Sequence, residues 1–182
     1  KVSAEDELFA LRGGVLTHNT RGALAVAAMR GSRRTLIVCP PVVLTNWQRN
    51  VDECGLATLG GQNPDGVLVE FRSGRKEPEI PDSGVVIISD SLLTSRKHLQ
   101  EALIEWSPDT FLFDEAHRAK NFEAARTQVM LSVAAASTFP VPMTGTPLFN
   151  TPHELAPLLE MTGHLTPIFG GISRRLRSRV AA

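Results

Sequence analysis

The 182-residue chain has two cysteines, no tyrosine and no excess charge of either sign. Cys39 lies in an apolar segment and Cys54 near an expected helix end, so reduced, partly buried thiols are favoured over a disulfide. With 19 basic and 19 acidic side chains, no global electrostatic field draws the chain onto nucleic acid. Contact with nucleic acid therefore depends on local arginine clusters, which are more often solvated surface than phosphate sites.

Long apolar runs are also missing. No segment approaches the roughly 20 apolar residues of a membrane span, and no signal peptide is present, so we expect an intracellular protein without membrane contact. No group of cysteines and histidines has the spacing of a zinc site. Hydrophobic residues make up 42% of the chain and charged residues 21%, which argues against disorder. The length predicts one domain over 1–182, and the first and last residues suggest a fragment of a longer protein.

Short apolar segments alternate with helical segments along the chain. This order predicts an α/β fold with a mainly parallel sheet and helices on both faces. The expected strands are 14–16, 35–39, 67–71, 85–89, 110–113 and 141–143. The expected helices are 21–29, 46–54, 92–105, 123–136 and 154–161, with Asn46 capping the second helix and Gly55 ending it.

The segment 110–117 is an apolar run that ends in two adjacent carboxylates, Asp114 and Glu115. If the run is a buried strand, both acids lie at its carboxyl end, where open α/β sheets bind their ligands. Such a pair suits Mg²⁺ with its shell of waters, and one acid can polarise an attacking water. The alternative is a plain strand end followed by a helix whose first turn is acidic.

Three segments together carry a resemblance to a known family. Asp114-Glu115-Ala116-His117 resembles the acidic motif of helicase superfamily two. Segment 35–47 is similar to the motif in which a strand ends at proline and an Asn-Trp pair opens a helix. Segment 143–150 resembles the Thr-Gly-Thr-Pro motif, with the asparagine typical of the Swi/Snf branch. The resemblance runs from about Gly13 to Arg179, and three motifs in one order are more specific than any one of them.

The resemblance implies the first RecA-like lobe, a three-layer sandwich, of a DNA-dependent ATPase that moves along double-stranded DNA. ATP and Mg²⁺ are the implied cofactors. Asp114 is expected to hold Mg²⁺ through water, and Glu115 to orient or deprotonate the attacking water. A second RecA-like lobe is the implied partner, because its arginines neutralise the charge that develops during phosphoryl transfer.

The resemblance also implies a link between two motifs. His117 is expected to connect the nucleotide site to Thr144, Gly145 and Thr146. These three residues would sense the acidic motif and transmit its state. Without the resemblance, a histidine after a strand is more often a surface or capping residue, and a Thr-Gly-Thr-Pro segment is a strand-exit turn.

Double-stranded DNA is the second implied partner. The candidate contacts are Thr45, Asn46, Ser89 and Asn150, whose polar groups suit backbone phosphates rather than base edges. Trp47 is expected to be a buried anchor.

The phosphate loop departs from the family. Relatives carry a Gly-x-Gly-Lys-Thr loop before an alanine-rich helix, but here only Thr17-His18-Asn19-Thr20 stands there, and no lysine occurs between Arg12 and Lys76. The loop is either absent from this sequence, truly lost, or mimicked by Gly13 and Thr20. Thr20 and Arg21, at the expected helix start, remain the candidate nucleotide-binding residues.

Two alternatives to a translocase lobe stay open. A catalytically silent lobe that binds DNA or a partner as a scaffold would fit a lost phosphate loop. An RNA helicase or a restriction-type motor would share the same acidic motif. For the translocase we expect a cytoplasmic or nucleoid-associated location.

Overall fold

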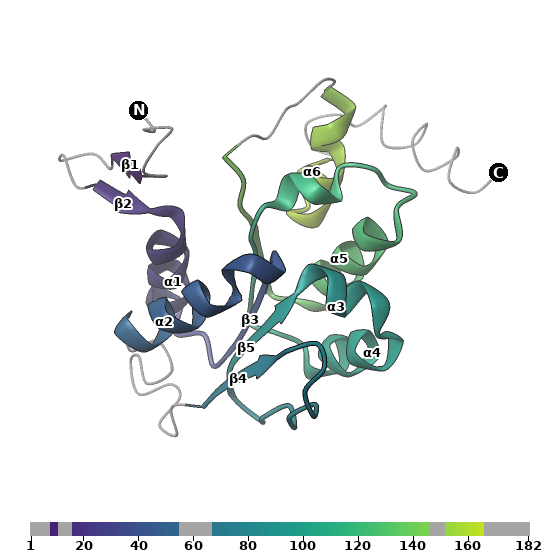
Figure 1. Ribbon diagram of the computed structural model, residues 1–182. Coiled ribbons are helices and arrows are strands. Elements are labelled where there is room, and N and C mark those ends of the chain that lie inside the picture. Colours follow the sequence, from purple (N-terminus) through teal and green to yellow (C-terminus); the bar gives the residue numbers. More distant parts are fainter. Residues whose placement is uncertain (1–7, 11–15, 55–66, 146–151, 166–182) are drawn as a thin grey trace.

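The computed structural model describes residues 8–10, 16–54, 67–145 and 152–165. Its centre is a five-stranded sheet in the order β4-β5-β3-β6-β7, in which every neighbouring pair is parallel (Figure 1). The strands are β3 (Arg34–Cys39), β4 (Leu68–Phe71), β5 (Gly84–Ser89), β6 (Thr110–Phe113) and β7 (Phe139–Pro142). All five carboxyl ends therefore meet at one edge of the sheet, as the sequence predicts for a ligand site.

Helices cover both faces of this sheet. On one face α1 (Asn19–Met29) and α2 (Leu44–Cys54) pack over alternate strand side chains such as Ile37, Ile87 and Leu112. On the other face lie α3 (Asp90–Ser95), α4 (Lys97–Trp106), α5 (Ala125–Ala136) and α6 (Ala156–Met161), over the intervening side chains. Because side chains alternate along a strand, one short apolar run supplies both cores. The predicted three-layer α/β sandwich is confirmed.

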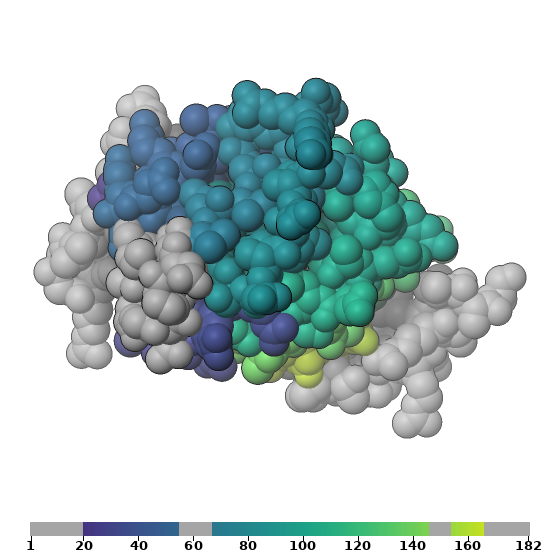
Figure 2. All heavy atoms as spheres, turned by 90° about the horizontal axis from the view of Figure 1, so that it is seen from below, coloured from purple at the N-terminus to yellow at the C-terminus, as the bar shows by residue number. Residues whose placement is uncertain are grey.

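One edge of the sheet is visible from below. Figure 2 shows β4 and the segment that leads to β5 at the surface, between α2 and α4.

In the part of the chain that the structure describes, no helix is long and apolar enough to cross a membrane.

The first expected strand is placed differently from the prediction. Only its last residue, Leu16, is described, and it begins β2 (Leu16–His18). This strand pairs antiparallel with β1 (Leu8–Ala10) in a separate two-stranded sheet and does not join the parallel sheet. Residues 14 and 15 lie outside the described residues, and the expected place of Leu16 in the parallel sheet is wrong.

Two helix predictions also need correction. The expected helix 92–105 is two helices, because Arg96 adopts an extended conformation (φ −116°, ψ 93°) between α3 and α4. The expected helix 46–54 begins two residues earlier, after the short 3₁₀ helix η1 (Pro41–Val43). Asn46 therefore lies inside α2 and is not its cap; its Oδ1 accepts hydrogen bonds from Arg49 and Asn50. Gly55 lies outside the described residues.

The start of β5 depends on a glycine. Gly84 has φ +141°, and a Cβ atom there would collide with the carbonyl oxygen of Val67. That oxygen accepts the backbone hydrogen bond of Val85 at 2.9 Å, so it cannot move without disturbing the first pairing of the strand. A side chain at Gly84 therefore combines backbone strain with a steric clash.

We expect Gly84→Ala to lower the free energy of unfolding by about 2–3 kcal/mol, measured by chemical denaturation. Gly74→Ala is the matched control, because Gly74 also has positive φ (+76°) but no heavy atom within 4 Å of an added Cβ. It should cost about 1 kcal/mol from backbone strain alone. Equal losses for the two variants would contradict the steric explanation.

Candidate functional site

Asp114 follows β6 at the carboxyl edge of the sheet and is held from three directions. Its backbone N–H donates to the carbonyl of Val38 on β3 at 2.8 Å. Its Oδ1 accepts the backbone N–H of Glu115 at 2.9 Å, and its Oδ2 accepts the indole N–H of Trp47 at 2.8 Å. Trp47 is 1% exposed and Asp114 8% exposed, so the indole bond is shielded from water. The predicted burial of Trp47 is confirmed, and its polar contact orients the carboxylate.

Glu115 has an unusual backbone for its residue type. Its φ of 51° and ψ of 47° place it in the left-handed region, which costs a non-glycine residue about 1–3 kcal/mol. The next residue begins η3 (Ala116–Ala119), and its N–H donates to the carbonyl of Met143 at 2.8 Å. Contacts to β3 and to the residue that follows β7 thus fix both sides of the acidic pair, while the Glu115 side chain stays 40% exposed. Such strain is found where geometry serves a function.

His117 connects the acidic pair to the segment after β7. Its Nδ1 lies 3.0 Å from Oγ1 of Thr144 and 3.0 Å from Oε2 of Glu115. The structure therefore brings together three of the residues that the sequence singled out. Gly145 is exposed beside them, and Thr146 lies outside the described residues. The coupling role of this group stays a prediction.

The acidic edge fits a magnesium ion that is bound through water. Among the described residues, no group of three or more histidine, cysteine or acidic side chains could cage a metal ion. Mg²⁺ usually keeps several waters and uses one or two carboxylates together with substrate phosphates. Asp114, oriented by its two hydrogen bonds, has the donor chemistry for such a water-mediated contact.

Thr20 and Arg21 lie in the first turn of α1. Thr20 is buried, and Arg21 reaches across to α2, where its Nη2 donates to Oε2 of Glu53 at 2.9 Å and its Nε to Oδ1 of Asn50 at 3.3 Å. Arg21 thereby ties α1 to α2. Nucleotide binding by either residue stays a prediction.

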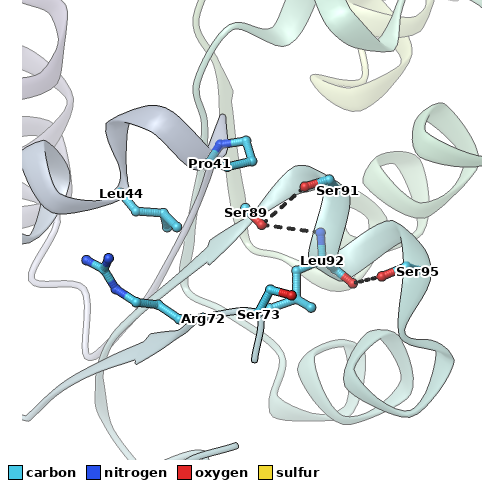
Figure 3. Close-up of a pocket in the computed structure, with 8 residues that line it drawn as sticks. All are labelled: Pro41, Leu44, Arg72, Ser73, Ser89, Ser91, Leu92 and Ser95. Atoms are coloured by element: carbon cyan, nitrogen blue, oxygen red, sulfur yellow. Dashed lines mark hydrogen bonds between the residues drawn. The ribbon is translucent and has the colours of Figure 1, made fainter. Parts of the chain in front are cut away.

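The residues expected to contact DNA are partly gathered around a pocket. Figure 3 shows it between the ends of β4 and β5 and the start of α2. Its volume is about 370 Å³. Ser89 lines it and caps α3 by accepting the N–H of Leu92 at 3.2 Å. Arg72 lines it too, and its Nη2 donates to Oγ1 of Thr45 at 2.8 Å. Asn150 lies outside the described residues.

A second buried carboxylate was not singled out as a site residue. Asp90 begins α3 directly after β5 and is 0% exposed. Its Oδ2 lies 3.3 Å from Nε of Arg118 and 3.1 Å from Nε of Arg126. Oδ2 has no partner with hydrogen-bond geometry, so these contacts are mainly electrostatic. The available signal was its position at a strand end, the same as that of Asp114.

Negative charge gathers around the end of β3. Burial raises the pKa of the Cys39 thiol strongly, and the charges of Asp114, Asp90 and Glu70 raise it further. Cys39 therefore stays a protonated, unreactive thiol at neutral pH. Both cysteines are free, as the sequence predicts.

Comparison with known proteins agrees with this arrangement. The model of the SNF2-related domain matches residues 16–166. Protein CHROMATIN REMODELING 19 of Arabidopsis thaliana is 33% identical over 133 residues, which cover 69% of this chain and 17% of that protein. DNA excision repair protein ERCC-6-like 2 of Mus musculus is 34% identical over 124 residues, which cover 66% of this chain and 7% of that protein. The chain thus spans less than a fifth of these relatives.

A solved structure shows the same fold. The Sulfolobus solfataricus SWI2/SNF2 ATPase core in complex with dsDNA aligns with a TM-score of 0.58 and 18% identity, covering 81% of this chain and 32% of that chain. The order of the motifs, the parallel sheet and the family match agree with one another. The chain therefore belongs to the SNF2-related family of helicase superfamily two, and its described sheet and helices form the RecA-like first lobe of that family.

Proposed function

We propose that this lobe binds ATP with Mg²⁺ and, joined to a second RecA-like lobe, couples ATP hydrolysis to movement along double-stranded DNA. The arrangement of Asp114, Glu115, His117 and Thr144 at the carboxyl edge of the sheet is the observation that carries the proposal. It supplies an oriented carboxylate, a solvent-accessible carboxylate and a histidine link to the segment that follows β7. Nucleotide hydrolysis uses this combination.

Each residue has a separate task in the proposed reaction. A bound Mg²⁺ would neutralise charge on the phosphates. Asp114 would orient the waters of that ion, and the N–H of Trp47 keeps its carboxylate from rotating. Glu115 accepts a hydrogen bond from the attacking water and aligns it with the γ-phosphate. His117, between Glu115 and Thr144, makes the position of the 143–145 segment depend on the state of the site.

The second lobe is part of the proposal. Glu115 is 40% exposed, which leaves its carboxylate open to groups outside this lobe. Phosphoryl transfer in such enzymes needs arginines that neutralise charge in the transition state, and these come from across the cleft. The matched residues cover 17% of one relative and 7% of another, so most of each relative lies outside the part that this chain matches.

Double-stranded DNA is the proposed track. The solved structure that shares the fold is a complex with dsDNA. The pocket between β4, β5 and α2 offers the guanidinium of Arg72 and the hydroxyls of Ser73, Ser89 and Ser91, which suit backbone phosphates (Figure 3). With Thr45 and Asn46, this face would follow the backbone with little sequence preference, and DNA contact by Asn150 stays a prediction. The protein would work where its DNA is, in the cytoplasm or on the nucleoid.

A silent scaffold lobe is the second candidate, because no Gly-Lys pair precedes Thr20 in this sequence. Displacement of a triplex-forming strand from duplex DNA by the full-length protein separates the two functions. A translocase displaces the strand only when ATP and Mg²⁺ are present. A scaffold binds the duplex but leaves the third strand in place with or without ATP, and that result would contradict our proposal. An RNA helicase would instead separate RNA strands.

Trp47→Phe should raise the Mg²⁺ concentration needed for half-maximal ATP hydrolysis by about 10-fold or more, since groups that orient a metal's carboxylate ligand typically contribute 10–100-fold in metal affinity. The substitution keeps the buried ring but removes the donor to Asp114. Hydrolysis by the full-length protein, titrated with Mg²⁺ at saturating DNA, measures the effect.

Trp106→Phe is the matched control, because Trp106 is the only other tryptophan and also makes an indole hydrogen bond, partly buried, to the carbonyl of Pro81 at 2.6 Å. It should lose stability without a change in Mg²⁺ dependence. The same Mg²⁺ dependence in both variants would show that Trp47 does not orient Asp114.

A further inference from the structure

The junction at Thr20 is unusual for a lobe of this family. A phosphate loop runs from a strand, through a glycine-rich turn that ends in Gly-Lys-Ser/Thr, into a helix. The helix is present: α1 packs Ala23, Leu24 and Ala27 into the same core as Trp47 and Val51 of α2. From Thr20 onward the chain therefore builds the lobe, but the residues before Thr20 are His18 and Asn19 instead of Gly-Lys.

Among the described residues before Thr20, no strand joins the parallel sheet as a phosphate loop requires. Among the described residues, the parallel sheet contains only β3 to β7, all of which follow α1. The strand next to α1 is β2, which pairs antiparallel with β1 in a sheet of its own. Figure 1 shows this hairpin beyond the N-terminal end of α1, away from the five-stranded sheet. Gly13-Gly14-Val15-Leu16 resembles the expected strand in sequence, but its one described residue, Leu16, pairs within the hairpin.

We propose that residues 1–19 are the C-terminal part of a self-splicing insert that interrupts the phosphate loop between its lysine and Thr20. His18-Asn19-Thr20 supplies the chemistry at the downstream junction, and the glycines and lysine of the loop lie upstream of the insert. The inference rests on the proposed function in one respect, because it takes Thr20 as the threonine that ends the phosphate loop.

The step at Asn19 is a cyclisation that cleaves the peptide bond to Thr20 and needs no outside reagent. The side-chain nitrogen Nδ2 of Asn19 attacks the backbone carbonyl carbon of the same residue and closes a succinimide ring. The bond from this carbon to the nitrogen of Thr20 breaks, and one proton passes from Nδ2 to the new α-amino group of Thr20. The imidazole of His18 is placed in sequence to donate a hydrogen bond or proton at this peptide bond.

Thr20 keeps the two flanks of the insert joined, since its hydroxyl is a nucleophile of the kind used in acyl transfer. Its Oγ1 attacks the acyl carbon of the upstream flank, which the insert carries as an ester or thioester on the hydroxyl or thiol of its own first residue. The new C–O bond forms as that ester or thioester bond breaks, and the Thr20 hydroxyl proton passes to the leaving oxygen or sulfur. Once Asn19 has cyclised, the amino nitrogen of Thr20 attacks the new ester, forms the peptide bond and restores the hydroxyl.

Excision would restore the missing loop. Thr20 would directly follow lysine, and α1 would begin as the helix of an intact phosphate loop, whose N–H groups face the nucleotide phosphates. The same event explains why Asn19 stands where the family has lysine and why the hairpin is separate from the parallel sheet. A lost loop explains the first observation but not the second.

Mass spectrometry of the full-length protein tests the proposal. We expect a mature protein in which a peptide joins Gly-Lys directly to Thr20, mapped with a protease that does not cleave at lysine or arginine. The released product should end at Asn19 and be one water lighter than the corresponding carboxylic acid, because it ends in a succinimide.

Three variants make the test specific. Asn19→Ala removes the attacking amide and should leave the junction at Thr20 uncleaved, so that the unspliced precursor accumulates. Thr20→Ser keeps a hydroxyl nucleophile and should still yield the joined product. Asn121→Ala, an asparagine far along the chain in a turn with Glu123, is the control and should splice like the wild type.

A mature wild-type protein that still contains Leu16 to Ala23 as one continuous peptide would overturn the proposal. So would an Asn19→Ala protein with the same mass as the mature wild type. These readouts are masses and not hydrolysis rates, so the spliced product is detected even if it has no ATPase activity. Conversely, ATP hydrolysis by a protein that is never spliced would agree with the proposed function and contradict the proposed self-splicing insert.

Discussion

Replacing Glu115 with glutamine is expected to lower ATP hydrolysis by the full-length protein about 10²–10⁴-fold, the range that a positioned acid–base group contributes. The amide has nearly the same shape as the carboxylate and can still bond to His117, but it cannot take a proton from the attacking water. The left-handed backbone at Glu115, fixed by the Ala116–Met143 hydrogen bond, should survive the change. Affinity for duplex DNA should therefore remain close to that of the wild type.

Steady-state phosphate release and a DNA-binding titration measure the two effects on the same preparation. Glu101→Gln is the control, because Glu101 is an exposed carboxylate on α4 that pairs with Lys97 at 3.6 Å. It should leave both quantities unchanged. Hydrolysis by Glu115→Gln at the wild-type rate would remove Glu115 from the catalytic role assigned to it.

Asp90→Asn is expected to have the largest effect on stability, a loss of about 3 kcal/mol in the free energy of unfolding. Asp90 is 0% exposed and is the shared partner of Arg118 and Arg126. The amide fills the same space but leaves two arginines, each 31% exposed in its side chain, without the carboxylate charge that both contact. Because the two arginines lie on η3 and α5, the change should also loosen the packing of α3 against both.

Asp109→Asn is the matched control for the lost charge. Asp109 accepts backbone N–H bonds from Arg33 and Arg34 and pairs with the Arg34 guanidinium at 3.8 Å, but its side chain is 36% exposed. Water screens that pair, so the substitution should cost less than about 1 kcal/mol. Urea denaturation measured under identical conditions compares the two. Similar losses would mean that the buried cluster contributes no more than a surface pair.

Local sequence patterns predicted most of the sheet because each strand is short, apolar and ended by a clear signal. The runs at β3, β5 and β6 are buried on both faces, so their apolar character alone indicates them. The strand expected at 141–143 begins two residues earlier, at Phe139 of β7. β7 contains Pro140 and Pro142, which an edge strand tolerates but which make the start of a strand hard to recognise from sequence. The acidic pair at the end of β6 was recognisable for the same local reason.

Contacts between distant segments could not be predicted this way. The Trp47–Asp114 bond joins residues 67 positions apart, and the Asp90 cluster unites three separate elements. Leu16 looked like a strand residue and is one, but pairing with β1 is a property of two segments together. Apolar periodicity reports which face of an element is buried. It does not report which polar atoms meet at the end of a sheet.

ATP hydrolysis by the full-length protein, with and without double-stranded DNA, is the most direct test of the central claim. We expect slow hydrolysis without nucleic acid, strong stimulation by duplex DNA of unrelated sequences, weak stimulation by RNA, and loss of turnover in Glu115→Gln. Hydrolysis that is absent under all conditions, while duplex DNA still binds, would rule out a translocase and identify the lobe as a scaffold.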